Sequence, residues 1–263
     1  IPKSVVLSHR NIIDFIDWCI ETFTFNQSDV IGSLSPFHFD IYILELFVSL
    51  SQGSVLHIIP PKESTFPADL VNFLLINSVT FIFWVPTIMV NISNLDILDV
   101  IKLSKLKKVF FAGEVFPTKH LNYWRTKLPD AEFVNLYGPI EIAVDCTYYV
   151  VNRFFEDGES VPIGKPCRNT DIIILDSNNK SVKDGGQGEL CVRGSSLSLG
   201  YFNNLDQTNK VFVQNPLINS YPEKIYRTGD LVYKNTHGEI MFVGRKDFQI
   251  KHMGYRIELL EIE

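Results

Sequence analysis

Apolar positions in the first half of the chain alternate between two spacings. After Ser8, a good N-cap, helical spacing places Ile12, Phe15, Ile16, Cys19, Ile20 and Phe23 on one stripe. Similar patterns predict helices over 40–50, 68–76 and 118–127. Compact apolar or β-branched runs, typical of buried parallel strands, cover 29–36, 54–59, 80–85, 108–112 and 132–137. The alternation predicts an α/β layered parallel sheet with right-handed crossovers.

Turn-forming residues become dense after about residue 155. The pairs Asp157-Gly158 and His237-Gly238 are turn signals, and short strands are predicted over 171–175, 189–193 and 240–243. This texture predicts a smaller, mostly β subdomain, such as a distorted barrel. We therefore expect an α/β subdomain over 1–155 and a β-rich subdomain over 156–246.

Composition narrows the class of protein. The 263 residues, 46% hydrophobic and 21% charged, describe an ordinary protein with a sizeable core. A formal charge of −6 argues against nucleic acid as the main partner, although a single bound nucleotide needs only a few local donors. The 4 cysteines show neither a C-x-x-C pair nor zinc spacing, so reduced thiols in a cytoplasmic protein are expected.

No sequence signal for a membrane or for secretion is present. Pro86 interrupts the apolar run from 81 to 90, which is too short for a membrane span. The chain opens with Ile-Pro-Lys-Ser rather than with a signal peptide, and it ends in Leu-Leu-Glu-Ile-Glu. Both ends look like cuts, so we expect a fragment of a longer protein.

Several polar clusters follow predicted strands, where ligands bind in open α/β sheets. In the segment 135–141, Tyr137 could stack on a purine, Gly138 permits close backbone approach, and Glu141 could ligate Mg²⁺ beside phosphates. The alternative is a strand-to-turn junction with a solvated glutamate.

Two more pairs of residues have the same ambiguity. Gly113 and Glu114 could bind a base or an amino group, or could form a helix-capping turn. Asp230 could accept bonds from two ribose hydroxyls and Arg245 could reach a phosphate or ribose oxygen, or both could belong to β-turns. Glu189, just after a glycine, is expected to be a turn or ladder residue rather than a catalyst.

The segment 37–40 joins aromatic rings to one carboxylate at the start of an apolar helix. Asp40 could be the counter-ion of a substrate ammonium, or it could cap the helix, because the helix dipole stabilises an acid there. His38, as a lone histidine, is expected to be structural.

Taken together, these clusters resemble the adenylate-forming superfamily over essentially the whole chain. The resemblance rests on Pro2-Lys3, Phe39-Asp40, Tyr137-Gly-Pro-Ile-Glu141, Gly188-Glu-Leu190, Gly200-Tyr201, Tyr226-Arg-Thr-Gly-Asp-Leu231 and Gly244-Arg-Lys-Asp-Phe-Gln-Ile-Lys251. The ending Gly254-Tyr-Arg-Ile-Glu258 is similar to the amino-acid-activating branch: nonribosomal peptide synthetase adenylation domains and stand-alone amino acid–carrier protein ligases. The resemblance implies a large-domain fragment with a hinge and the start of a C-terminal domain over 247–263.

The resemblance also implies a two-step reaction. A carboxylate attacks the α-phosphate of Mg·ATP to give acyl-AMP and pyrophosphate, and the phosphopantetheine thiol of a carrier protein then takes the acyl group. Positioning and charge neutralisation of phosphates account for most of such catalysis. The implied cofactors are ATP and Mg²⁺, and the implied partners are an amino acid and a carrier protein.

By motif, Lys3, Glu141 and Arg245 form the implied catalytic set. Lys3 resembles the lysine that ends the phosphate loop, and Glu141 resembles the magnesium ligand. Asp247 resembles the family hinge.

The remaining implied nucleotide contacts lie at strand ends. Gly113 and Glu114 resemble the contacts at the adenine edge, and Tyr137, followed by Gly138, resembles the ring that stacks on adenine. Asp230 is similar to the aspartate that holds the ribose hydroxyls.

The implied substrate site begins at Phe39, which looks like an aromatic gate, and at Asp40, which would pair with the α-amino group because a buried ammonium needs a partner. The side-chain pocket would be lined by Ile41, Leu44, Phe83, Phe110, Ala112, Leu136 and Val144. Asp145 fits this apolar lining only if it points away. The lining predicts a small apolar amino acid.

Two family members are most similar. Residues 145–149 and the pocket set resemble stand-alone L-proline–carrier protein ligases, which we favour. The stretch 112–117 also resembles D-alanine–carrier protein ligases, where a cysteine is expected in place of Ala112.

The chain departs from the family pattern at three points. Ile140 replaces a threonine, Ser4 rather than glycine follows Lys3, and the phosphate loop and the C-terminal domain with its catalytic lysine are absent. The polypeptide alone is therefore expected to be weakly active or inactive.

Two other functions fit these residues less well. An acyl-CoA or fatty-acid ligase would leave Asp40 unpaired against an acyl chain, which costs several kcal/mol. A non-catalytic nucleotide-binding relative is supported by Ile140 and opposed by Lys3, Glu141 and Asp230. A dehydrogenase is excluded, because no G-x-G-x-x-G follows a predicted strand.

Overall fold

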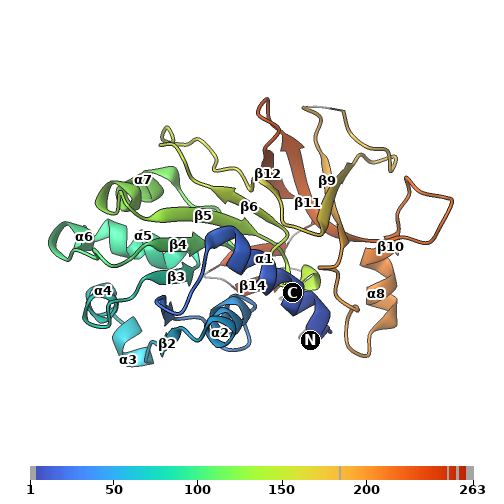
Figure 1. The fold of residues 1–263 in the computed structure, drawn as a ribbon. Coiled ribbons are helices and arrows are strands. Elements are labelled where there is room, and N and C mark those ends of the chain that lie inside the picture. Colours follow the sequence, from blue (N-terminus) through green and yellow to red (C-terminus); the bar gives the residue numbers. More distant parts are fainter. Residues whose placement is uncertain (1–3, 184, 248, 253–254, 259–263) are drawn as a thin grey trace.

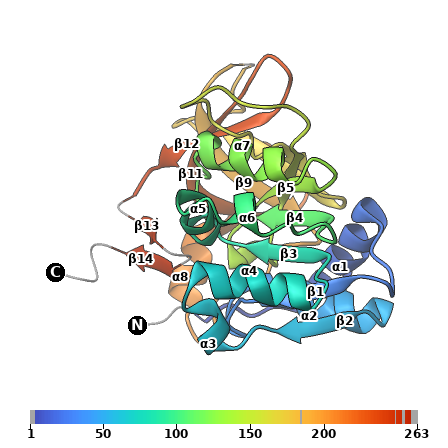
Figure 2. The same ribbon diagram turned by 90° about the vertical axis from the view of Figure 1, so that its left-hand side faces the viewer.

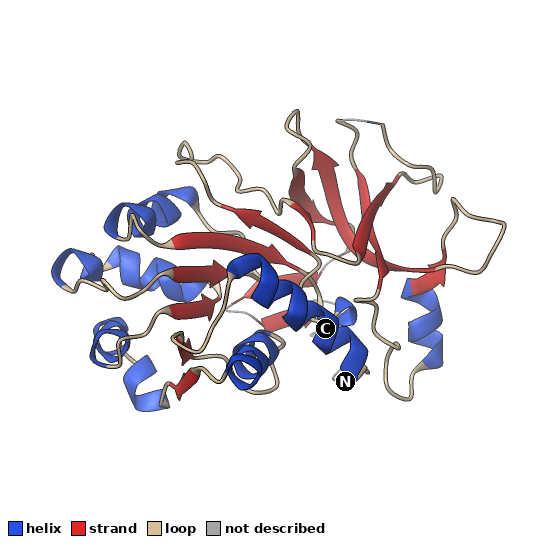
Figure 3. Cartoon of the chain, viewed as in Figure 1, coloured by secondary structure: helices blue, strands red, loops and turns tan. Residues whose placement is uncertain are grey.

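Two sheets organise the chain (Figure 1). The computed structural model describes residues 4–183, 185–247, 249–252 and 255–258. Helices gather around the first sheet, whereas α8 (Leu205–Val211) lies beside the second (Figure 3). The predicted layered α/β part followed by a smaller β part is confirmed.

The first sheet has the strand order β2-β1-β3-β4-β5-β6-β7. Its strands are β1 Val30–Ser33, β2 Val55–Ile58, β3 Phe81–Trp84, β4 Lys108–Phe111, β5 Glu132–Tyr137, β6 Thr147–Val150 and β7 Lys165–Pro166. The strands from β2 to β5 pair in parallel, while β6 and β7 pair antiparallel. The chain therefore reverses its direction in the sheet directly after β5.

One predicted strand is less buried than expected. The run over 54–59 was interpreted as a buried strand, but Val55 is 49% and Ile58 66% exposed in β2. The reason is position: β2 is the edge of the sheet, so it has a neighbouring strand on one side only.

Helices cover both faces of the first sheet (Figure 2). They are α1 His9–Phe23, α2 Ile41–Gln52, α3 Pro61–Ser64, α4 Pro67–Ile76, α5 Pro86–Asn94, α6 Ile97–Val100 and α7 Thr118–Lys127. Along β3, Phe81 and Phe83 join the core under α1 and α2, and Ile82 and Trp84 join the core under α4, α5 and α7. Alternate side chains of a strand point to opposite faces, so each face has its own core.

The second sheet is antiparallel and curled, with the order β10-β11-β9-β8 and β12 paired to β11. Its strands are β8 Thr170–Leu175, β9 Gly188–Gly194, β10 Phe212–Gln214, β11 Lys224–Lys234 and β12 Ile240–Arg245. Its core includes Ile142 and Cys146 from the connection between β5 and β6. That connection therefore packs into both parts of the molecule. Two further strands, β13 (Gln249–His252) and β14 (Tyr255–Glu258), pair with each other in antiparallel fashion.

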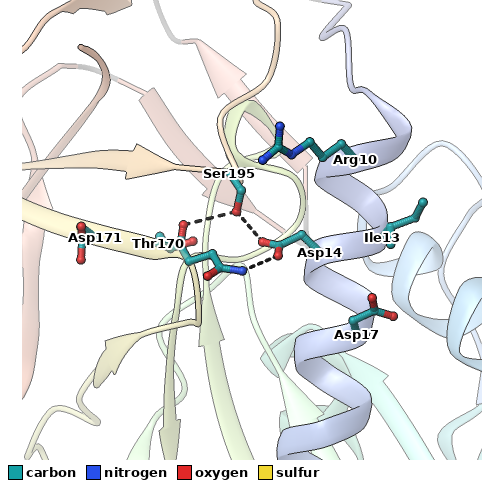
Figure 4. A pocket seen from close by; sticks show the side chains of 8 residues that line it. Arg10, Ile13, Asp14, Asp17, Thr170, Asp171 and Ser195 are labelled. Carbon is teal, nitrogen blue, oxygen red and sulfur yellow. Dashed lines mark hydrogen bonds between the residues drawn. The ribbon is translucent and has the colours of Figure 1, made fainter. Parts of the chain in front are cut away.

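Helix α1 ties the two sheets together. The Asn11 amide donates to the carbonyl oxygens of Ser195 and Leu197, and the Asp14 carboxylate accepts from the Ser195 hydroxyl and the Asn169 amide. A groove of about 740 Å³ lies along this contact (Figure 4). Its lining holds none of the residues proposed from sequence for the nucleotide or the amino acid.

Glu45 is a fully buried carboxyl on α2. It accepts a 2.6 Å hydrogen bond from the Ser33 hydroxyl, and its Oε1 has no hydrogen-bond partner within the part of the chain that the structure describes. Burial raises the pKa of Glu45 well above its ordinary value, against the opposing effect of the Ser33 bond.

We expect Glu45→Gln to become increasingly stabilising, relative to the native chain, as pH rises. The folded carboxyl keeps its proton at a pH where the unfolded one has lost it, so native stability falls as pH climbs from the ordinary glutamate pKa towards the raised one. The neutral amide has no such dependence. Urea unfolding of both proteins between about pH 4 and 8 measures the effect. A difference in unfolding free energy that stays constant with pH would contradict it.

Candidate functional site

Three of the residues predicted to contact the nucleotide, Tyr137, Asp230 and Arg245, meet where the end of β5 faces the second sheet. Tyr137 is the last residue of β5, and its hydroxyl donates to Oδ2 of Asp230 on β11. The Tyr137 ring centroid lies 6.4 Å from that of Phe242 on β12. Burial, together with the adjacent Asp230 carboxylate, raises the pKa of Tyr137 well above its ordinary value. Tyr137 is therefore a neutral hydrogen-bond donor.

Glu141 lies on the short 3₁₀ helix η1 (Ile140–Ile142), directly after β5. Its side chain is fully buried, and Oε1 accepts a 2.6 Å hydrogen bond from the hydroxyl of Tyr201. Its carbonyl oxygen accepts the Ser198 amide at 2.9 Å. The alternative of a solvated glutamate at a turn is therefore wrong.

The chain after Glu141 is unusually tight. Ala143 and Val144 adopt left-handed φ angles of 55° and 77°, which cost about 1–3 kcal/mol for a non-glycine residue and cluster at functional sites. The Cys146 amide then bonds back to the Tyr137 carbonyl at 2.8 Å. A Cβ on Gly138 would lie 2.4 Å from the Asp145 Cα, so glycine is required here for packing of the chain itself.

Asp230 and Arg245 pair directly across β11 and β12. Asp230 is 7% exposed and its Oδ1 accepts the Arg245 Nη1 at 2.7 Å. The same guanidinium also donates from Nε and Nη2 to the two oxygens of the Asp247 carboxylate, each at 2.6 Å. Asp230 therefore accepts donors from both sheets, the Tyr137 hydroxyl and the Arg245 guanidinium.

Gly113 and Glu114 follow β4. Gly113 has a left-handed φ of 89°, a conformation that favours glycine. The Glu114 carboxylate accepts the backbone amide and the hydroxyl of Thr87, at 3.0 and 2.6 Å, in the first turn of α5. The capping alternative therefore describes the Glu114 side chain in this structure.

Asp40 is the N-cap of α2, and its Oδ1 accepts the Ile41 amide at 3.0 Å. Asp40 and Phe39 are half-buried. The structure thus places the carboxylate at the start of the helix, as the capping alternative expected.

The seven apolar pocket residues predicted from sequence all lie in one hydrophobic cluster: Ile41, Leu44, Phe83, Phe110, Ala112, Leu136 and Val144. The ring centroids of Phe83 and Phe110 are 6.2 Å apart. Asp145 is 2% exposed. Burial of the Cys146 thiol raises its pKa, and the neighbouring Asp145 carboxylate raises that pKa further. Asp145 therefore lies near a thiol in the interior.

Sequence reasoning assigned no role to Tyr201, although the motif Gly200-Tyr201 was part of the family resemblance. Glu189 is a ladder residue of β9, as expected, and its carboxylate also contacts Arg227 and the Gly229 amide. Lys3 lies outside the described residues.

Comparison with known proteins decides the family. Residues 1–202 match the family described as AMP-binding enzyme. The chain belongs to that family. Enzymes of the family use ATP with Mg²⁺, in agreement with the cofactors expected from the sequence.

Similar proteins include nonribosomal peptide synthetases. The chain is 35% identical over 269 residues to zwittermicin A synthase ZmaJ of Bacillus cereus, covering 100% of the chain and 50% of that protein. It is 34% identical to tyrocidine synthase 1 of Brevibacillus parabrevis, with 100% of the chain and 23% of that protein covered. The chain thus spans half the length of these relatives or less.

Solved structures with a similar fold support the same family. The structure of IdnL1 superposes with a TM-score of 0.91 at 29% identity, over 100% of this chain and 54% of that one. The Vibrio cholerae adenylation domain AlmE, solved with glycyl-adenosine-5'-phosphate, gives a TM-score of 0.87 at 29% identity, over 100% and 49%. In the described part of this chain, no helix is long and apolar enough to cross a membrane.

We expect Tyr201→Phe to lower the free energy of unfolding by about 1–3 kcal/mol, because it removes a hydrogen bond from the buried Glu141 carboxylate. Tyr221→Phe is the control, since Tyr221 is 53% exposed, and its effect should stay within about 0.5 kcal/mol. Urea unfolding measures both. Equal effects of the two variants would show that the Tyr201 hydroxyl adds no stability.

Proposed function

We propose that this chain forms the nucleotide- and amino-acid-binding part of an enzyme that uses ATP to activate a small apolar amino acid as aminoacyl-AMP. The acyl group then passes to the phosphopantetheine thiol of a carrier protein. The observation that carries the proposal is the meeting of Tyr137, Glu141, Asp230 and Arg245 at one junction of the two sheets. Membership of the AMP-binding enzyme family supports it.

In this proposal, ATP lies against the end of β5. Tyr137 offers the face of its half-buried ring to adenine, and the Asp230 carboxylate accepts the ribose hydroxyls. Because Thr87 engages the Glu114 carboxylate, we assign the adenine-edge contacts of Gly113 and Glu114 to their backbone. Arg245 supplies positive charge beside the ribose.

Glu141 would hold the magnesium ion. Mg²⁺ binds oxygen ligands and is usually held by one or two carboxylates together with substrate phosphates and waters, so a single buried carboxylate beside the nucleotide fits. A bound ion would neutralise phosphate charge. Lys3, outside the described residues, is proposed to contact the same phosphates.

The amino acid would sit between Asp40 and the apolar cluster. Asp40 pairs with the ammonium group, and Phe39 adjoins the path of the carboxylate. The apolar lining is almost fully buried, which favours a small side chain. The solved complex of AlmE holds a glycyl adenylate, in line with a small amino acid. We propose L-proline, with D-alanine as the alternative.

Three further assignments belong to the proposal. Asp247 is the hinge, and the two hydrogen bonds from Arg245 to its carboxylate orient the Asp247 side chain. The proposed domains are an α/β subdomain over 1–155, a β-rich subdomain over 156–246, and the hinge with the start of a C-terminal domain over 247–263. Ile140 in place of threonine removes one hydroxyl near the phosphates, without removing Glu141.

Amino-acid-dependent ATP–pyrophosphate exchange by the full-length protein tests the function. The substrates are L-proline, D-alanine, L-alanine, L-valine and a medium-chain fatty acid. Exchange with L-proline alone is expected. A preference for D-alanine would keep the reaction and replace the substrate, and a preference for the fatty acid would refute the role of Asp40. Absence of exchange in a protein that binds ATP would favour a non-catalytic relative.

We expect Asp40→Asn to raise KM for the amino acid by about 100-fold or more while KM for ATP stays unchanged. Asparagine caps a helix as well as aspartate does, so α2 keeps its cap, but the ammonium loses its counter-ion, worth about 3–5 kcal/mol when buried. Exchange kinetics give both constants. An unchanged KM for the amino acid would assign Asp40 to helix capping alone.

A further inference from the structure

Strand β11 contains a bulge where it passes β9. Arg227 pairs with Cys191 and Leu231 pairs with Glu189, so four residue steps on β11 lie opposite two on β9. In this stretch β11 has two residues more than β9, and these two residues have no partner in the ladder with β9. Bulges beside active sites re-aim side chains, and this one carries Asp230.

Glu189 lies on β9, opposite the bulge, with its side chain 7% exposed. Its Oε1 accepts the Gly229 amide at 3.1 Å. Its Oε2 accepts Nε and Nη2 of Arg227, at 2.9 and 2.5 Å, and lies 3.3 Å from Nζ of Lys246. One carboxylate therefore holds a backbone amide of the bulge and two cations next to it.

One other bulge bond has a charged donor, because Nη1 of Arg245 donates to the Thr228 carbonyl at 3.1 Å, and the following bonds are made by neutral groups. The Thr228 hydroxyl donates to the Leu190 carbonyl at 2.7 Å and accepts the Asp230 amide at 3.0 Å. The Gly229 carbonyl accepts the Lys246 amide at 2.8 Å. Among these bonds, the contact from Gly229 to Glu189 has an ionised acceptor, and such bonds are about twice as strong as neutral ones.

We propose that Glu189 is a positioning residue for the nucleotide. By fixing the Gly229 amide it fixes the backbone immediately before Asp230, and so it sets where that carboxylate meets the ribose. Glu189 acts through the bulge and does not touch the nucleotide. This inference rests on the proposed function, because it takes the ribose hydroxyls as the ligand of Asp230.

A second ion pair on the same sheet provides a matched control. Arg193, also on β9, donates Nη1 to both oxygens of Glu223 at 3.0 Å, just before β11 begins. This pair also joins β9 to the region of β11, but here β9 carries the arginine and the other strand region carries the glutamate. The Glu223 carboxylate is bonded by Arg193 and Asn215, and no bond to it from the bulge residues is seen in the described chain.

The test uses the full-length protein with two readouts. Exchange kinetics give KM for ATP and for the amino acid, and calorimetry gives the Kd for AMP without turnover. Glu189→Gln should raise KM for ATP and Kd for AMP about tenfold, while KM for the amino acid stays within about twofold. Glu223→Gln should leave all three constants within about twofold. Asp230→Ala, which removes the ribose contact itself, calibrates the loss of AMP binding.

Two results would overturn the inference: wild-type ATP and AMP constants in Glu189→Gln, or an equal rise in Glu223→Gln. If Glu189→Gln does not fold, Glu189→Asp decides, since it keeps the charge but is one methylene shorter. A raised Kd for AMP supports positioning, and an unchanged value refutes it. Absence of exchange by the wild-type protein would refute the proposed reaction. The Kd values for AMP would still test the positioning role of Glu189.

Discussion

Two tyrosine–carboxylate hydrogen bonds cross between the sheets, and the site depends on them. Tyr137 of the first sheet donates to Asp230 of the second, and Tyr201, which follows β9, donates to Glu141, which follows β5. A carboxylate is costly to bury without partners. Each sheet thus supplies a tyrosine donor for an acid of the other, and Asp230 has Arg245 of its own sheet as a second donor. The site therefore exists only where the two parts of the chain are joined.

The reversal of strand direction after β5 creates the space for that junction. Parallel strands bring their carboxyl ends to one edge, where ligand-binding loops gather. Because β6 runs antiparallel, the chain turns back at once, through the left-handed residues Ala143 and Val144. The turn places Glu141 between the sheets and leaves Val144 in the apolar cluster beside Phe110. Acid and apolar lining therefore come from one short connection.

Local patterns were sufficient for most of the first sheet. The bounds of β5 and α7 match the predicted 132–137 and 118–127, because apolar periodicity there is strong and the flanking residues break it. Strand β11 was not predicted, since the Thr-Gly-Asp run inside it has the composition of a turn and forms the bulge. The contacts of Tyr201 with Glu141 and of Glu189 with Gly229 span 60 and 40 residues, so no local pattern contains them. The residues predicted to line an apolar pocket fall in one hydrophobic cluster, because hydrophobic strand ends share a core. Their role as a substrate pocket stays a prediction.

The left-handed backbone at Val144 has a consequence for redesign of the pocket. Exchanging lining side chains between relatives assumes that the backbone beneath them is indifferent to the exchange. At this position it is not, because a β-branched residue is held at φ 77° by the surrounding chain. A glycine there would relax the loop and would also remove a side chain from the apolar cluster. Under the proposed function, a variant library that includes Val144 therefore samples substrate selectivity and loop rigidity at once.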